Sequence, residues 1–327
     1  MNDNKPKITH LFRPFNLITI ALTMTLLKYG LMEPMLGVIS EAVKMELVSQ
    51  INIIQFLMLI SSVVLIAAGG YILNDIKDVK IDKVNNAANP VGKLISEELA
   101  NKWYQITTGL GLALSFLVAF QLGNYNYGII QLTAAISLWF YSHHFKTQFL
   151  SGNLIVAFVV ALVPLIVGIY EVSLVQMFYF NKVVEFVDFN FNFLAYWFIA
   201  YAFFVFVITL IRELIKDIED VKGDASVGAK TLPIVLGVKW AKSISSALLL
   251  LTIGGLVYVR MYYLTDAISA VFILIAVLLA LVNIISIWKQ SGMLFKASTW
   301  AKILSITGVL YLIALGYIID HQLFFNV

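Results

Sequence analysis

The sequence predicts an all-α, polytopic membrane protein, a bundle of about nine transmembrane helices. Its 327 residues are 61% hydrophobic, and their mean hydropathy is +0.90. Only 13% of the residues are charged, whereas a soluble domain is nearer about a quarter. Apolar stretches long enough to cross a bilayer recur along the whole chain. We therefore treat residues 1–327 as a single transmembrane domain.

Nine mostly apolar segments follow one another, and each approaches the length of about 20 residues that a membrane-spanning helix needs. A short polar tail, residues 1–12, precedes the first segment. Two polar connections, 74–102 and 215–240, follow the second and the sixth. The least certain division lies near residues 123–127, where two apolar segments almost merge. We predict spans at 14–37, 51–73, 104–122, 126–142, 152–170, 193–214, 242–259, 264–288 and 301–319.

Basic residues are unevenly distributed over the segments that connect these spans. With the N-terminus inside, the inside segments hold 18 of the 22 Lys and Arg residues. The other four are Lys28, Lys44, Lys182 and Arg260. Cytoplasmic segments carry the excess of Lys and Arg in membrane proteins. We therefore predict a multi-pass protein of the cell inner membrane with its N-terminus in the cytoplasm and its C-terminus outside.

Two acidic clusters with the same spacing lie at the ends of the second and sixth predicted spans. Residues 74–82 read NDIKDVKID and residues 217–224 read DIEDVKGD, so both contain D-x-x-D-x-x-x-D. Six of the ten Asp residues in the chain belong to these clusters. Positions i, i+3 and i+7 share one face of a helix, so each cluster presents three carboxylates together. The predicted orientation puts both clusters on the cytoplasmic side.

A divalent metal ion that holds a diphosphate is the cationic partner that best suits these carboxylates. Mg²⁺ binds one or two protein carboxylates together with phosphate oxygens, and a metal stabilises charge on a departing group. Asn74 adds a neutral oxygen beside the first cluster. The alternative is a pair of solvated helix ends whose Asp side chains pair with nearby lysines, which the repeated spacing disfavours. The absence of Cys excludes thiolate ligands, and no basic run indicates nucleic acid.

Basic side chains on the same predicted side extend the candidate site. Cations beside a metal–diphosphate complex neutralise the phosphate oxygens that the metal leaves free, a role that suits Lys146, Arg212 and Lys230. The alternative for any one of them is a lysine or arginine reaching the membrane surface. Tyr141 is placed to approach a leaving group, or to act as an interfacial aromatic.

Other polar residues lie close to the ends of the spans. Asn16 and Asn153 are just inside spans one and five, where polar side chains often face a cavity. His143 and His144 are adjacent and point about 100° apart on a helix, so they do not easily chelate one metal ion.

These motifs together make the chain resemble the UbiA superfamily of intramembrane prenyltransferases. Four stretches carry the resemblance in the right order: RPFN at 13–16, NDIKDVKID at 74–82, YSHHFK at 141–146, and KDIEDVKGD at 216–224 running into KTLP at 230–233. They span most of the chain. The resemblance implies a bundle around a central cavity, in which Mg²⁺ and an allylic prenyl diphosphate bind and a lipophilic acceptor receives the prenyl group.

The resemblance also implies a role for each matching residue. The expected metal ligands are the oxygen donors of the two Asp clusters: Asn74, Asp75, Asp78, Asp82, Asp217, Asp220 and Asp224. The expected catalytic residues are four of these carboxylates and two later polar side chains: Asp75, Asp78, Asp217, Asp220, Tyr141 and Lys146. The expected substrate-binding residues are amides and cations near the clusters: Asn16, Asn74, Lys83, Lys146, Arg212 and Lys230.

One stretch departs from the pattern of many relatives, which carry Arg residues in an R-x-x-R-P arrangement shortly after the first Asp motif. Residues 85–93 here read NNAANPVGK, with Asn86 and Asn89 where Arg is expected. Lys83 and Lys93 are the candidate replacements for the phosphate contact. The second motif resembles the digeranylgeranylglyceryl phosphate synthase-like branch. We therefore predict geranylgeranylglyceryl phosphate as the acceptor and an ether lipid as the product.

Three other functions compete with this prediction. An aromatic quinone precursor of the naphthoate, homogentisate or 4-hydroxybenzoate type is the alternative acceptor. A cation-coupled membrane transporter also carries acids within the membrane, but its site lies near the midplane at broken helices, whereas both clusters lie at helix ends. A non-catalytic scaffold would keep the bundle without needing both clusters.

Overall fold

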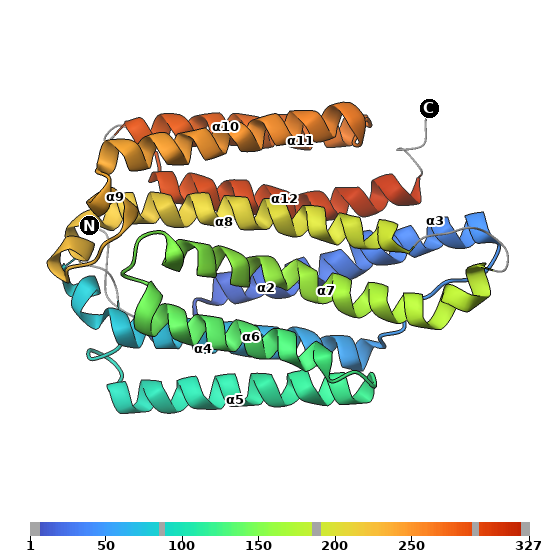
Figure 1. The fold of residues 1–327 in the computed structure, drawn as a ribbon, viewed down its shortest axis with the longest axis horizontal. Coiled ribbons are helices and arrows are strands. Elements are labelled where there is room, and N and C mark those ends of the chain that lie inside the picture. The colour runs from blue at the N-terminus through green and yellow to red at the C-terminus, as the bar shows by residue number, and fades with distance from the viewer. Residues whose placement is uncertain (1–6, 85–88, 185–190, 290–293, 322–327) are drawn as a thin grey trace. The chain divides into compact units, whose positions relative to one another are not determined.

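The computed structural model describes residues 7–84, 89–184, 191–289 and 294–321, and its regular elements in these ranges are helices (Figure 1). Eight helical segments are long and apolar enough to cross a membrane, and one of them, Ile8–Val43, is made of four of the elements named next. This confirms the predicted all-α, polytopic class. In chain order the elements are α1 (Ile8–Phe12), α2 (Pro14–Leu27), η1 (Lys28–Met32), α3 (Glu33–Val43), α4 (Ile53–Val84), α5 (Glu97–Gln121), α6 (Asn126–Phe140), η2 (Tyr141–Phe145), α7 (Ser151–Val184), α8 (Asn192–Ser226), α9 (Leu232–Val235), α10 (Val238–Tyr262), α11 (Ala267–Trp288) and α12 (Ala297–Asp320).

The predicted span at 126–142 corresponds to α6, which is not among these eight helices. α6 has 15 residues and is continued by the π-helical turn η2, so it falls short of the length that the eight spans reach. The break that the sequence predicts near residues 123–127 is present in the structure. α5 ends at Gln121, and Gly123 takes a left-handed backbone conformation with a φ of 72°, which glycine adopts without a steric penalty.

Both Asp clusters lie at helix ends, as the sequence predicted, and these helices continue into the predicted connections 74–102 and 215–240. α4 continues to Val84 and α8 to Ser226, so each cluster occupies the last turns of a helix. A side-chain bond one turn long supports α4 there, since Asn74 Nδ2 donates to Asp78 Oδ2 at 2.7 Å. The carboxylates therefore have helical spacing.

The chain forms two compact units. Unit 1 comprises Met1–Ala21, Ile53–Val159 and Lys216–Ala241, and it carries both Asp clusters. Unit 2 comprises Leu22–Asn52, Val160–Ile215 and Lys242–Val327.

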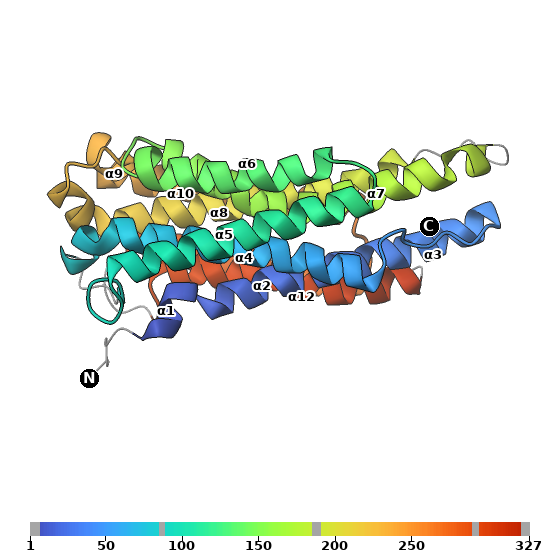
Figure 2. The same ribbon diagram turned by 90° about the horizontal axis from the view of Figure 1, so that it is seen from below.

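In unit 1, α4 packs against both α5 and α6 (Figures 1 and 2). A Cβ atom on Gly111 of α5 would lie 3.0 Å from the carbonyl oxygen of Ser62 in α4, so the two backbones approach closely. Ser62 Oγ donates a buried hydrogen bond to Gln131 Oε1 of α6 at 2.7 Å. Small residues and interhelical hydrogen bonds are the usual sources of helix association in lipid. These two contacts fix the rotation of α4 about its own axis relative to α5 and α6.

A small apolar core lies at the end of α4 that carries the first Asp cluster. Its buried members come from α1, α4, α5 and the segment before α5: Leu11, Ile72, Ile76, Val91, Ile95 and Ala100. Phe12 of α1 and Trp103 of α5 stack beside it with ring centroids 5.5 Å apart. This core anchors α1 and the segment before α5, so that Arg13 and Asn89 reach the carboxylates of α4.

Unit 2 contains α12 packed against α11, η1 and α3. A Cβ atom on Gly30 of η1 would lie 2.6 Å from the carbonyl oxygen of Leu312 in α12, so this contact requires glycine. A second core joins α8, α10 and α11, with Ile211, Leu249 and Ala280 fully buried.

A buried ion pair also lies in unit 2. Lys28 of η1 is 2% exposed and Glu171 of α7 is 0% exposed, and the two side chains are bonded to each other. Lys28 Nζ also donates to Ser49 Oγ, and Ser49 Oγ contacts Glu171 Oε2 at 2.6 Å. The pair thereby ties the segment between α3 and α4 to η1 and α7.

Candidate active site

The first carboxylate of the site, Asp75, is held by an arginine from the other side of unit 1. Arg13 Nη2 donates to Asp75 Oδ1 at 2.6 Å, and the guanidinium also lies 5.0 Å from the ring centroid of Tyr71. Asp75 is only 5% exposed. The guanidinium of Arg13 is the charge-assisted donor that compensates this buried carboxyl group.

The backbone places Arg13 by an unusual turn. Arg13 follows the short helix α1 with a φ of 48° and a ψ of 59°, in the left-handed region. Pro14 then begins α2, where its fixed φ and missing N–H suit the first helical position. The Arg-Pro pair thus separates α1 from α2, and the guanidinium contacts Asp75 of α4.

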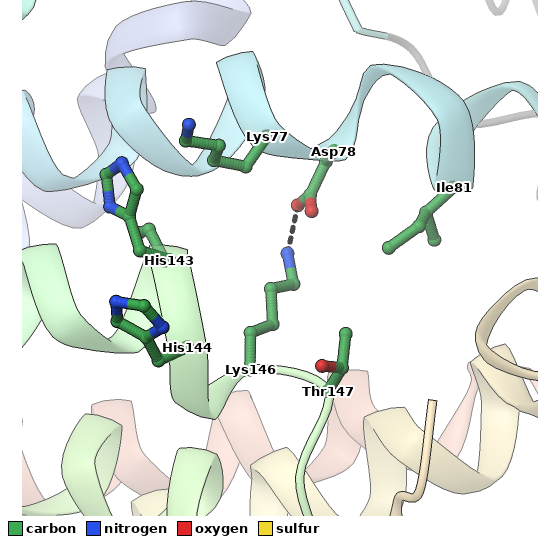
Figure 3. Close-up of a pocket in the computed structure, with 8 residues that line it drawn as sticks. Lys77, Asp78, Ile81, His143, His144, Lys146 and Thr147 are labelled. Atoms are coloured by element: carbon green, nitrogen blue, oxygen red, sulfur yellow. Dashed lines mark hydrogen bonds and ion pairs between the residues drawn. The ribbon is translucent and has the colours of Figure 1, made fainter. Parts of the chain in front are cut away.

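Asp78 contacts Lys146, which follows η2. The Lys146 ammonium donates to Asp78 Oδ2 (Figure 3). It also donates to Asn74 Oδ1 at 2.9 Å. The backbone N–H of Lys146 donates to Tyr141 O at 2.9 Å, which closes the π-helical turn. Such turns are frequent at functional sites. Helix α7 approaches the same place, because a Cβ on Gly152 would lie 2.7 Å from Phe145 O.

Asn89 joins Asp75 and Asp82 from the segment before α5. Its Nδ2 donates to Asp75 O at 2.8 Å and to Asp82 Oδ2 at 2.7 Å, while Oδ1 accepts from Val91 N at 2.9 Å. The side chain is 4% exposed. Asn89 therefore fixes the Asp82 carboxylate and the segment before α5 at the same time.

The second Asp cluster reaches the same end of unit 1. Asn153 Nδ2, at the start of α7, donates to Asp217 Oδ2 at 2.9 Å. Asp224 interacts electrostatically with Asp220, with Lys146 and with Asp78. The backbone N–H of Lys230 donates to Thr147 O at 2.7 Å, which joins the segment after α8 to the segment after η2. Lys146 therefore lies in the field of carboxylates from both motifs.

The other predicted residues are distributed over α2, α4, η2, α8 and the segment after α8. Asn16 is half-buried in the first turn of α2, and Tyr141 begins η2. The side chains of Lys83, in the last turn of α4, and of Lys230 are exposed. Arg212 belongs to unit 2, where its Nη1 donates to Glu213 Oε1 at 2.7 Å. Asn86 falls outside the described residues.

Three residues of the site were not among the predicted site residues: Arg13, Asn89 and Asn153. Each makes its contact with an Asp residue at least seven positions away in the chain. Arg13-Pro14 at the start of an apolar stretch and the polar Asn153 at the start of another were visible signals. Neither signal identifies the carboxylate that receives the bond.

The donor atoms of the site suit Mg²⁺. They are carboxylate and amide oxygens, the ligands that Mg²⁺ prefers, and this ion keeps places for water and phosphate oxygens. Asp78 Oδ1 is buried and has no hydrogen-bond partner within the described ranges, so its lone pairs are directed to no donor there. In the same ranges, no three His, Cys, Asp or Glu side chains converge closely enough to hold a metal ion without further ligands. The set fits an ion that completes its shell with substrate oxygens.

Replacing Asn89 with alanine is expected to lower the rate of prenyl transfer roughly tenfold to a hundredfold, while the protein still folds. The change removes two donors and one acceptor from a buried position, at a cost of about 1–3 kcal/mol for the groups left unpaired. Rates and thermal melting of the detergent-solubilised protein are the measurements. Asn101→Ala is the matched control, since Asn101 Nδ2 bonds only its own helix, to Glu97 O at 3.0 Å, on an exposed surface. Equal rates for Asn89→Ala and wild type would contradict the positioning role.

An all-helical membrane protein with two equally spaced Asp motifs and a lysine between them has the architecture of an intramembrane prenyltransferase. The chain belongs to the UbiA prenyltransferase family, whose model matches residues 45–318. It is therefore a prenyltransferase, and the transporter hypothesis is set aside.

Individual relatives agree with this assignment. The chain is 35% identical over 255 residues to the digeranylgeranylglyceryl phosphate synthase of Saccharolobus solfataricus, which covers 75% of this chain and 79% of the relative. It is 32% identical over 257 residues to the enzyme of that name from Sulfurisphaera tokodaii, covering 77% and 81%. A UbiA homologue from Archaeoglobus fulgidus, solved with GPP and Mg²⁺, superposes with a TM-score of 0.59 over 96% of this chain and 99% of its own, at 15% identity. At this level of identity, the likeness is evidence for the fold alone.

Proposed function

We propose that this protein transfers a prenyl group from an allylic prenyl diphosphate to a hydroxyl of geranylgeranylglyceryl phosphate, with Mg²⁺. The observation that carries the proposal is the meeting of both Asp motifs with Lys146 at one end of unit 1. The names of the relatives, at 32% and 35% identity, support this acceptor. The donor is supported by the Archaeoglobus fulgidus homologue, which was solved with GPP and Mg²⁺.

The carboxylates of the two motifs, Asp75, Asp78 and Asp82 with Asp217, Asp220 and Asp224, would hold the metal, with Asn74 beside them. When bound, Mg²⁺ supplies positive charge to the diphosphate oxygens. Lys146 adds a charge-assisted donor to the same oxygens. The allylic C–O bond breaks and the diphosphate leaves with the electron pair. The acceptor hydroxyl oxygen forms the new C–O bond, and its proton passes to a carboxylate of the site.

A cytoplasmic position for this chemistry is part of the proposal. With the nine predicted spans, 18 of the 22 Lys and Arg residues fall on one side, which supports a cytoplasmic N-terminus, cytoplasmic Asp motifs and a C-terminus outside. The lipid tails of donor and acceptor remain in the inner membrane.

An acceptor screen tests the proposal. Purified protein with Mg²⁺ and radiolabelled geranylgeranyl diphosphate is offered geranylgeranylglyceryl phosphate, 1,4-dihydroxynaphthoate, homogentisate and 4-hydroxybenzoate in separate reactions, each repeated with EDTA. We expect a labelled ether lipid with the first acceptor, and no product in EDTA. A labelled aromatic product would replace the proposed acceptor by a quinone precursor. Transfer that persists in EDTA would overturn the role of the metal.

A further inference from the structure

A small pocket opens beside the Asp78–Lys146 pair, and the function described so far does not use most of its wall. Two elements of unit 1 line it. α4 contributes Lys77, Asp78 and Ile81, and the stretch around η2 contributes Ser142, His143, His144, Lys146 and Thr147 (Figure 3). Its volume is about 70 Å³, room for roughly five water molecules. The pocket therefore suits a compact polar group and is too small for a prenyl chain.

The wall of the pocket is rich in basic groups. Lys77, His143 and His144 lie on one side of the Asp78–Lys146 pair in Figure 3, and Ile81 and Thr147 lie on the other. Asp78 is the one carboxylate in the lining, and it already accepts from Lys146. Lys77 thus adds a positive charge, and the two histidines add ring nitrogens that can form hydrogen bonds. The single carboxylate does not balance these groups. An anion is the ligand that such a wall favours.

The orientation of His143 is set by its own helix. Its ring stacks on Trp139 with centroids 4.3 Å apart and an interplanar angle of 25°, and Nδ1 lies 2.9 Å from Trp139 O. A ring nitrogen that bonds a carbonyl carries the proton, and this fixes the tautomer. His143 is therefore oriented before any ligand arrives, which lowers the ordering cost of binding.

We propose that this pocket binds the phosphate group of the acceptor, with Lys77, His143 and His144 as its specificity-determining residues. The inference rests on the proposed function. A phosphate monoester carries a charge of about −1.5 to −2 near neutral pH. Asp78 and Lys146 belong both to this pocket and to the carboxylate site. A glycerol headgroup, with only a few bonds between phosphate and hydroxyl, reaches both at once and presents the hydroxyl to the reacting carbon.

The test compares the double variant His143→Gln/His144→Gln and the single variant Lys77→Gln with wild type. Lys80→Gln is the matched control, since Lys80 is exposed on α4 and does not line the pocket. We expect the KM for geranylgeranylglyceryl phosphate to rise roughly tenfold to a hundredfold, the range for hydrogen bonds to a charged group. The KM for geranylgeranyl diphosphate stays within about twofold, and Lys80→Gln behaves as wild type. Glycerol phosphate, as a soluble probe, competes with the acceptor in wild type and loses this effect in the variants.

A neutral acceptor separates the pocket from a general defect. Geranylgeranylglycerol lacks the phosphate, so wild type and the pocket variants should use it with the same KM. Three results would overturn the inference: a rise in the KM of the donor instead of the acceptor, an unchanged acceptor KM in the variants, or an equal loss with the neutral acceptor. If wild type prenylates none of the glycerol acceptors, the proposed function itself fails. If wild type prenylates geranylgeranylglyceryl phosphate and the variants have the same kinetics as wild type, only the pocket assignment fails.

Discussion

Replacing Asp78 with asparagine lowers kcat/KM for prenyl transfer by roughly 10³-fold, because a metal and its ligands contribute several kcal/mol of charge stabilisation to such a reaction. The substitution keeps the shape of the side chain and removes its negative charge. Lys146 then faces a neutral amide instead of the carboxylate that it contacts, and a metal loses the negative charge carried by the buried oxygen Asp78 Oδ1. Steady-state rates with Mg²⁺ and labelled donor are the measurement.

Two controls separate lost chemistry from lost folding in this experiment. Glu98→Gln removes a carboxylate from the same unit at an exposed position, where Glu98 pairs only with Lys102 of its own helix at 2.9 Å, and it should retain full activity. The melting temperature of Asp78→Asn should stay close to that of wild type, since the polar contacts of the amide replace part of those of the carboxylate. Wild-type rates for Asp78→Asn would remove Asp78 from the catalytic site.

Replacing Lys28 with methionine destabilises the protein by about 3–5 kcal/mol, the usual cost of leaving one partner of a buried pair uncompensated. Glu171 is fully buried, and without Lys28 its charge is left with the hydroxyl of Ser49. The segment between α3 and α4 also loses its attachment to η1. Thermal unfolding in detergent, followed by tryptophan fluorescence, measures the loss.

The double variant Lys28→Met/Glu171→Met distinguishes a stranded charge from lost packing. Removing both charged groups often costs little, because no buried ion then remains. We therefore expect the double variant to melt at a higher temperature than Lys28→Met alone. The charge explanation fails if both variants melt at the same reduced temperature. Basal activity serves as the check that the variants still reach the native fold.

The spans were predictable because each apolar stretch is an independent, local signal. A bilayer requires about 20 apolar residues whatever the neighbouring helices do, so α4, α7 and α8 follow from composition. The spacing of the Asp clusters was equally local, since three carboxylates at i, i+3 and i+7 share a face on any helix. What the local pattern did not reveal was where the helices end, because charged residues such as those of 74–84 continue a helix as readily as they leave it.

The partners of the carboxylates were not predictable in the same way. Arg13 meets Asp75 across 62 positions of sequence, and Asn153 meets Asp217 across 64. Such pairs depend on the packing of α1 and α7 against other helices, which one sequence does not encode in any short motif. Asn89 is an example. It stands where the sequence pattern leads us to expect an arginine, so the sequence suggested only the loss of a phosphate contact. In the structure it makes three hydrogen bonds that join Asp75, Asp82 and Val91.

The π-helical turn at Tyr141–Phe145 sets the direction in which the side chain of Lys146 points. A π-turn holds one residue more than a regular helical turn, and each added residue rotates everything after it by about 100° around the helix axis. The direction of the lysine is therefore encoded in the number of residues that precede it, independently of their identity. A chain with the same lysine and a regular helix at this point would aim the ammonium at a different face. The register of a single backbone turn thus decides whether the two acidic motifs share one cation.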